Sequence, residues 1–116
     1  MSGAKNRTMK IPIYGGKLQI VISDNFLKDA KKHGFSDMGV YDAFASLDEE
    51  EDTILLMFDS KNITPGIVAH EAIHVMGFVF AARGVFYDPE NDEPAAYFIN
   101  WVVDQVYRKI GQKSKS

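Results

Sequence analysis

The sequence contains no cysteine, only three histidines and no excess of basic charge. The absence of cysteine excludes a disulfide framework and a thiolate zinc site, so a transition metal must be held by histidine and carboxylate groups. With a net charge of −3, the chain lacks the positive field typical of nucleic-acid binding. The longest apolar run, around residues 75–82, is too short to span a bilayer, and no apolar signal-peptide core is present. We therefore expect a cytoplasmic protein without a nucleic-acid or membrane partner.

What remains is an ordinary globular composition, 46% hydrophobic and 25% charged over 116 residues. This length predicts one domain with a modest core and little spare chain for a deep substrate cleft. We expect that domain to cover residues 1–116, with residues 1–9 and 111–116 as polar, disordered tails.

The strongest local pattern lies in residues 64–84. Thr64 is a suitable N-cap, Pro65 suits the first helical turn, and Gly84 can end a helix in the left-handed conformation. Nearly every residue between them is apolar or small, apart from one polar trio. A helix that is apolar on all sides is expected inside the domain, where unpaired polar groups are costly.

The polar trio consists of His70, Glu71 and His74, in the pattern His-Glu-x-x-His. On a helix, an offset of four residues places both imidazoles on one face, within reach of one zinc ion. Glu71 projects beside them and can act as general base on a water molecule. The alternative is a buried histidine pair bonded to carbonyl groups, with Glu71 neutral or ion-paired. The helix signals and the use of two of the three histidines favour the metal site.

The other segments predict an α+β fold: a small sheet of about four strands, packed on the His-Glu-x-x-His helix and a C-terminal helix. The expected strands lie at residues 11–14, 17–23, 40–47 and 53–58, the first two joined across Gly15-Gly16. The expected further helices lie at residues 25–33, capped by Asp24, and at about 93–110, capped by Asp92. The acidic run at residues 48–52 is interpreted as a solvated connection.

A zinc site needs a third protein ligand. His33 belongs to another helix and is interpreted as its solvated last residue. Downstream carboxylates are available at Asp88, Glu90, Asp92, Glu93 and Asp104. Glu93, at the start of the C-terminal helix, is the preferred ligand, and Tyr97 lies one turn further along the same face. Candidates to stabilise an oxyanion are Tyr97, Tyr87 and Arg83.

Together these residues resemble the zincin fold, and within it the gluzincin pattern of two histidines from one helix and a glutamate from the next. The match covers about residues 64–110. A metzincin would continue to a third histidine, where this chain has Phe80, and an aspzincin would use Asp88 or Asp92 as third ligand. The chain also resembles small phage- or prophage-encoded zincin-like proteins, through its His-Glu-Ala-x-His helix and the segment Asn-Asp-Glu-Pro-Ala-Ala-Tyr at residues 91–97.

The expected function is that of a zinc-dependent metallopeptidase acting on a protein or peptide substrate. Zn²⁺ would be held by His70, His74 and Glu93, with Glu71 as general base and Tyr97 as a further catalytic residue. An extended substrate could add to an exposed sheet edge, for which residues 53–58 are the first candidate. The alternative is a non-catalytic zincin-like metal-binding domain that binds a partner protein, which the small size favours. Other first-row divalent ions would also suit these ligands.

Overall fold

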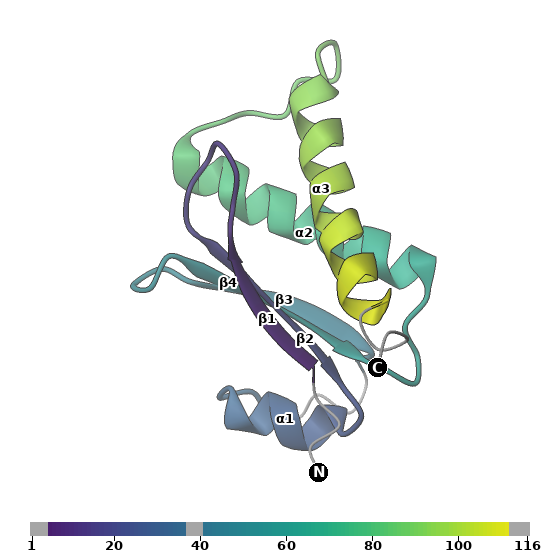
Figure 1. Ribbon diagram of the computed structural model, residues 1–116. Helices are drawn as coiled ribbons and strands as arrows, with labels where there is room; N and C mark the ends of the chain where they lie inside the picture. Colours follow the sequence, from purple (N-terminus) through teal and green to yellow (C-terminus); the bar gives the residue numbers. More distant parts are fainter. Residues whose placement is uncertain (1–4, 37–40, 112–116) are drawn as a thin grey trace.

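A four-stranded mixed sheet forms the centre of the computed structural model, which describes residues 5–36 and 41–111 (Figure 1). The strands are β1 (Lys5–Lys10), β2 (Lys17–Ser23), β3 (Ala43–Asp48) and β4 (Thr53–Asp59), in the spatial order β1-β2-β4-β3. β2 and β4 run parallel, and each edge strand is antiparallel to its neighbour. The helices are α1 (Phe26–Lys32), α2 (Pro65–Arg83) and α3 (Glu93–Gly111). The expected small α+β domain with about four strands is confirmed.

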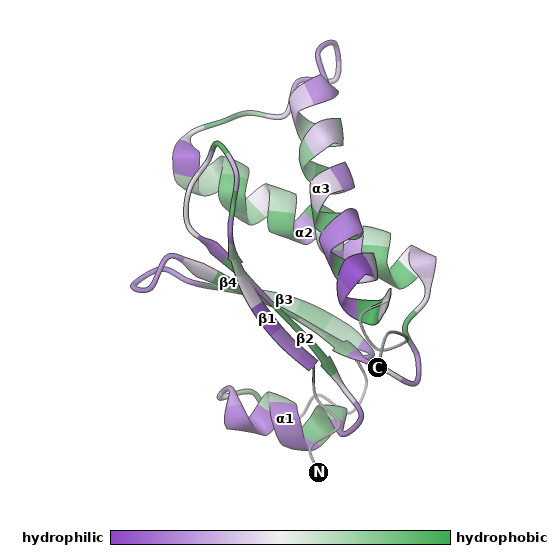
Figure 2. Ribbon diagram, in the orientation of Figure 1, coloured by the Kyte–Doolittle hydropathy of each residue, from purple (hydrophilic) through white to green (hydrophobic). Residues whose placement is uncertain are grey.

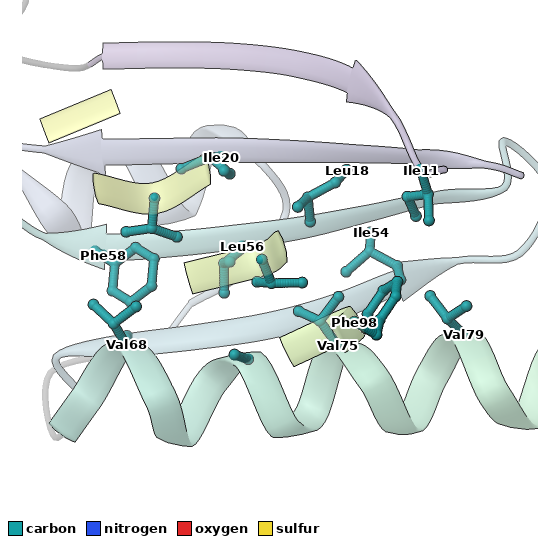
Figure 3. Packing of buried hydrophobic residues seen from close by; sticks show 14 of the residues in the cluster. Ile11, Leu18, Ile20, Ile54, Leu56, Phe58, Val68, Val75, Val79 and Phe98 are labelled. Carbon is teal, nitrogen blue, oxygen red and sulfur yellow. The ribbon is translucent and has the colours of Figure 1, made fainter. Parts of the chain in front are cut away.

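Both faces of the central strands are covered. Ile54, Leu56 and Phe58 of β4 point into the larger core beneath α2 and α3, as Figure 3 shows. Leu55 and Met57 point to the opposite face, where they pack with Phe26 and Ala30 of α1. Because successive residues of a strand face opposite sides, a continuous apolar run is what a strand covered on both faces requires.

The position of β4 corrects one expectation about substrate binding. β4 pairs with β2 on one side and β3 on the other, so residues 53–58 offer no free edge. Within the part of the chain that the structure describes, the edge strands are β1 and β3.

The amino-terminal hairpin differs from the prediction. Its first strand is β1, not residues 11–14, so the expectation of a disordered tail is wrong for residues 5–9. It is also wrong for Gly111, which belongs to α3, while residues 1–4 and 112–116 lie outside the described residues. β1 alternates half-buried and exposed residues, and lysines at both of its ends suit a solvent-facing edge. Residues 11–16 form the connection instead, because Pro12 cannot donate a ladder hydrogen bond. Ile13 there has a positive φ of 69°.

The smaller elements agree with the sequence to within a few residues. The N-cap of α1 is Asn25, whereas Asp24 accepts a hydrogen bond from the Ser60 hydroxyl. β3 begins at Ala43, and residues 37–40, which include the expected start of that strand, lie outside the described residues.

The ends of α2 follow the sequence signals. The Thr64 side chain accepts a hydrogen bond from the Ile67 N–H, and Gly84 adopts the left-handed conformation. One face of α2 is buried, with Val68, Val75 and Val79 directed at the sheet (Figure 3). Among the described helices, α2 is also long and apolar enough to cross a membrane by length and composition alone. Only 33% of that stretch is buried inside the structure, so packing on the sheet accounts for part of its apolar composition.

Candidate metal centre

His70 and His74 lie on the side of α2 that faces away from the sheet. Both are exposed, with 68% of the His70 side chain accessible, whereas Val68, Ala72 and Val75 are fully buried on the other side. The expectation that the helix is buried on all sides is therefore wrong for the two histidines. Apolar residues occur on every side of α2, but only those that face the sheet or α3 are packed against other residues. Because the two imidazoles stay in contact with water, the fold pays little desolvation free energy for them.

The two imidazoles approach each other closely. Their Nε2 atoms are 3.3 Å apart, and the ring planes meet at 72°. Two ligands on a tetrahedral zinc ion at 2.0–2.1 Å have nitrogen atoms about 3.3–3.4 Å apart, because the tetrahedral angle fixes that edge. The pair thus has the separation that one zinc ion requires. Without metal, a neutral ring can donate its Nε2–H to the other ring across the same distance.

Glu71 is the buried member of the trio. Its side chain is 10% exposed, and Oε2 lies 4.0 Å from Nε2 of His70. Burial raises the pKa of this carboxyl above 4.5, and the neighbouring His74 and His70 act in the opposite direction. A carboxylate in such surroundings is a suitable acceptor for a proton, and it lies beside the imidazoles, as the sequence predicts.

Glu93 and Tyr97 lie together on one face of α3, as their spacing predicts, but not beside the histidines. Both line an apolar pocket formed with the loop between β1 and β2. Among residues 5–36 and 41–111, no third histidine, aspartate or glutamate joins His70 and His74 in a group able to hold a metal ion. The assignment of Glu93 as third ligand stays a prediction, and so does a catalytic role for Tyr97.

The alternative ligands are also exposed and separate from the pair. Asp88 accepts a hydrogen bond from the Glu90 N–H in the connection between α2 and α3, and Asp92 and Asp104 are exposed. His33 is the exposed C-cap of α1, which packs on the other face of the sheet, in agreement with its interpretation as a solvated helix end.

Arg83 has a structural role rather than the oxyanion role considered for it. Its Nε donates to the Tyr14 carbonyl at 2.6 Å, and its NH2 group reaches the Asp52 carboxylate at 2.9 and 3.1 Å. The guanidinium therefore ties the end of α2 to both hairpin loops. Of the two remaining oxyanion candidates, Tyr87 lies in the connection and is 55% exposed.

Sequence reasoning missed the apolar pocket lined by Ile13, Tyr14 and Trp101. The sequence signal for this pocket is the density of apolar residues around Pro12, a pattern that predicts a strand rather than a loop. The pocket needs a loop and a helix that are remote in sequence, so no local pattern could reveal it.

No protein-family model, curated protein or solved structure matches this chain.

Proposed function

We propose that this protein is a zinc-dependent metallopeptidase, in which His70 and His74 hold Zn²⁺ and Glu71 is the general base. The observation that carries the proposal is the 3.3 Å separation of the two Nε2 atoms, which equals one edge of a zinc tetrahedron. The same separation suits a hydrogen bond between two neutral rings, and the buried Glu71 carboxylate beside the pair is the feature that favours the metal site. We also propose that the protein acts in the cytoplasm.

Each member of the trio has a separate task. The imidazoles supply neutral nitrogen ligands from a rigid helix, so the metal position is set by the backbone of α2. A zinc ion in this place would activate a water molecule and polarise the carbonyl of a peptide bond. Glu71 would serve as the proton acceptor for a water molecule at this place and would return the proton to the leaving amine. Burial on the sheet side keeps the carboxylate close to the imidazoles.

Glu93 is the proposed third ligand. It belongs to the first turn of α3, directly after residues 84–92, which form neither helix nor strand. The later part of α3 is anchored in the core by Phe98, Val102 and Val106. Ala95, in the first turn, is buried in the same core, so Glu93 would reach the histidine pair only if the start of α3 repacks.

The edge strand β3 is the proposed place for an extended substrate. β3 pairs with β4 on one side, and α2 packs against it. A peptide that adds to the outer edge of β3 would lie alongside the metal-binding helix and gain main-chain hydrogen bonds without a deep cleft.

The first test measures metal content. Protein purified with zinc and then dialysed should retain about one zinc per chain, and His70→Ala and His74→Ala should each lose it. His33→Ala is the matched control, because it removes an exposed histidine that lies at the end of α1. Zinc retained in both His70→Ala and His74→Ala would contradict the metal site.

The third ligand and the activity need separate variants. Glu93→Gln should lower zinc affinity at least tenfold, whereas Glu90→Gln, which changes an exposed neighbour, should not. Glu71→Gln should keep the zinc but abolish cleavage of a peptide library, and equal cleavage by this variant would refute hydrolysis by this site.

The second candidate function is a zincin-like domain that binds a partner protein without cleaving it. The open apolar pocket beside α3 favours this alternative, because such a surface is a usual mark of a protein-binding site. Zinc-dependent stability without hydrolysis of any peptide would distinguish this function from that of a peptidase.

A further inference from the structure

An open apolar pocket of about 600 Å³ lies between the loop that joins β1 to β2 and the first turns of α3. None of the histidine–glutamate trio lines it. Figure 1 shows the loop between β1 and β2 beside the carboxyl-terminal end of α2, and Figure 2 shows part of this loop in green, the colour of hydrophobic residues. The pocket is within the size range of small-ligand and peptide-anchor sites.

The walls of the pocket are fixed in place. Tyr14 packs against Phe98 and Phe80, with ring centroids 5.7 and 5.5 Å apart. The Tyr14 carbonyl is held by Arg83, so the loop is tied to α2 on its other side. A pocket that exists before binding lowers the entropic cost of taking up a ligand.

The rim of the pocket is unusually apolar for a solvent-facing surface. Ile13 is 96% exposed and has a φ of 69°, a conformation that β-branched residues rarely adopt. Tyr97, on the opposite wall, is 67% exposed. A strained, exposed isoleucine gains nothing from the fold itself, and strain of this kind is typical of functional surfaces.

The surroundings of the pocket are acidic. Asp88, Glu90, Asp92 and Glu93 are all exposed in the segment that leads into α3. Residues 11–16 and 84–101 contain no lysine or arginine. The rim therefore attracts cations and repels the anionic surface of a cytoplasmic membrane leaflet.

The apolar walls and the acidic segment beside them together fit a segment of another protein that carries one apolar side chain and adjacent basic side chains.

We propose that this pocket binds an extended peptide segment in which a bulky apolar side chain is followed by lysine or arginine. The apolar side chain fills the space between Ile13 and Trp101, and the basic residues face Glu90 and its acidic neighbours. This binding needs neither zinc nor Glu71, and Glu93, which lines the pocket, is the residue that it shares with the proposed metal site.

Trp101 provides a direct readout, because it lines the pocket and is the single tryptophan of the chain. The protein for the assay is the full chain with Glu71→Gln in EDTA, so that failure of the proposed peptidase function cannot affect the result. The probe is acetyl-Gly-Leu-Lys-Lys-amide, and the controls are acetyl-Gly-Ser-Lys-Lys-amide and acetyl-Gly-Leu-Glu-Glu-amide. We expect a saturable blue shift of tryptophan emission with the probe and a response at least tenfold weaker with each control.

Two variants locate the site. Ile13→Gly removes the apolar rim and should weaken probe binding about tenfold, as the loss of one large aliphatic contact predicts. Glycine adopts the positive φ freely, so the fold should be retained. Leu27→Ala, which shortens an exposed side chain on α1, is the control and should bind normally.

The charge requirement is tested in the same assay. Glu90→Lys should weaken probe binding several-fold, and Glu49→Lys, in the exposed acidic connection between β3 and β4, should not. Raising the salt from 0.05 to 0.5 M should also weaken binding, because screening reduces the attraction. Equal responses to all three peptides, or no response at millimolar probe, would refute the proposal. The proposal would also be refuted if the emission shifted with protein concentration in the absence of probe and the protein sedimented faster. That result would mean that a second copy of the chain fills the pocket.

Discussion

Arg83 offers the most direct test of how α2 holds the loop between β1 and β2 in place. Arg83→Met keeps the aliphatic stem but removes the hydrogen bond to Tyr14 and the ion pair with Asp52. The hydrogen bond contributes about 1 kcal/mol, and the ion pair at most about 1 kcal/mol because Asp52 is half exposed. We therefore expect the free energy of unfolding to fall by about 1–2 kcal/mol. An unfolding entropy of about 0.24 kcal/mol/K for this chain length converts that loss into a Tm lower by about 4–8 °C.

The assay is urea and thermal unfolding followed by circular dichroism, with Arg108→Met in the last turn of α3 as the matched control. In 1 M NaCl the difference between wild type and Arg83→Met should shrink by the ion-pair part but not vanish. The variant should also bind the Leu-Lys-Lys probe more weakly, because the loop that carries Ile13 is no longer tied to α2. Arg83→Met with wild-type stability and wild-type probe affinity would refute the role assigned to this contact.

Three further predictions concern the trio and the core. In metal-free protein, the free energy of unfolding of the wild type should fall relative to Glu71→Gln as the pH rises above about 4.5, because a native carboxyl with a raised pKa binds its proton more tightly than the unfolded chain does. Urea unfolding between pH 4 and 8 checks this, and parallel profiles would contradict it. Phe58→Ala, at a fully buried position, should cost about 3–5 kcal/mol by urea unfolding, whereas truncation of the exposed Phe86 should cost less than about 0.5 kcal/mol. Zinc at a hundred times its Kd should stabilise the wild type by about 2.7 kcal/mol and raise its Tm in a thermal scan. It should leave the Tm of His74→Ala unchanged, and an equal rise in both would exclude this site as the cause.

Local patterns were sufficient for much of the fold. Thr64, Pro65 and Gly84 mark the ends of α2 because capping chemistry depends only on neighbouring residues. The continuous apolar run in β4 indicates that both of its faces are covered, because successive residues of a strand point to opposite sides. β1 escaped prediction because an edge strand is held by main-chain pairing with β2 and needs few apolar side chains.

The candidate site was predictable in part. Helical spacing alone places His70 and His74 on one face, and Glu71 beside them. It does not say whether that face meets the sheet or the solvent, because an all-apolar helix shows no preferred buried side. The expected burial of the histidines failed for this reason.

The sequence by itself determined the elements that depend on near neighbours: the capped helix α2, the histidine pair on one of its faces, and the C-terminal helix α3. Only the tertiary structure decided that Glu71 is buried while the histidines are exposed, and that Glu93 lines an apolar pocket with Ile13. The physical reason is the distance along the chain over which each interaction acts. Capping and helical periodicity act over a few residues, whereas burial and the approach of a loop to a distant helix depend on how whole elements pack.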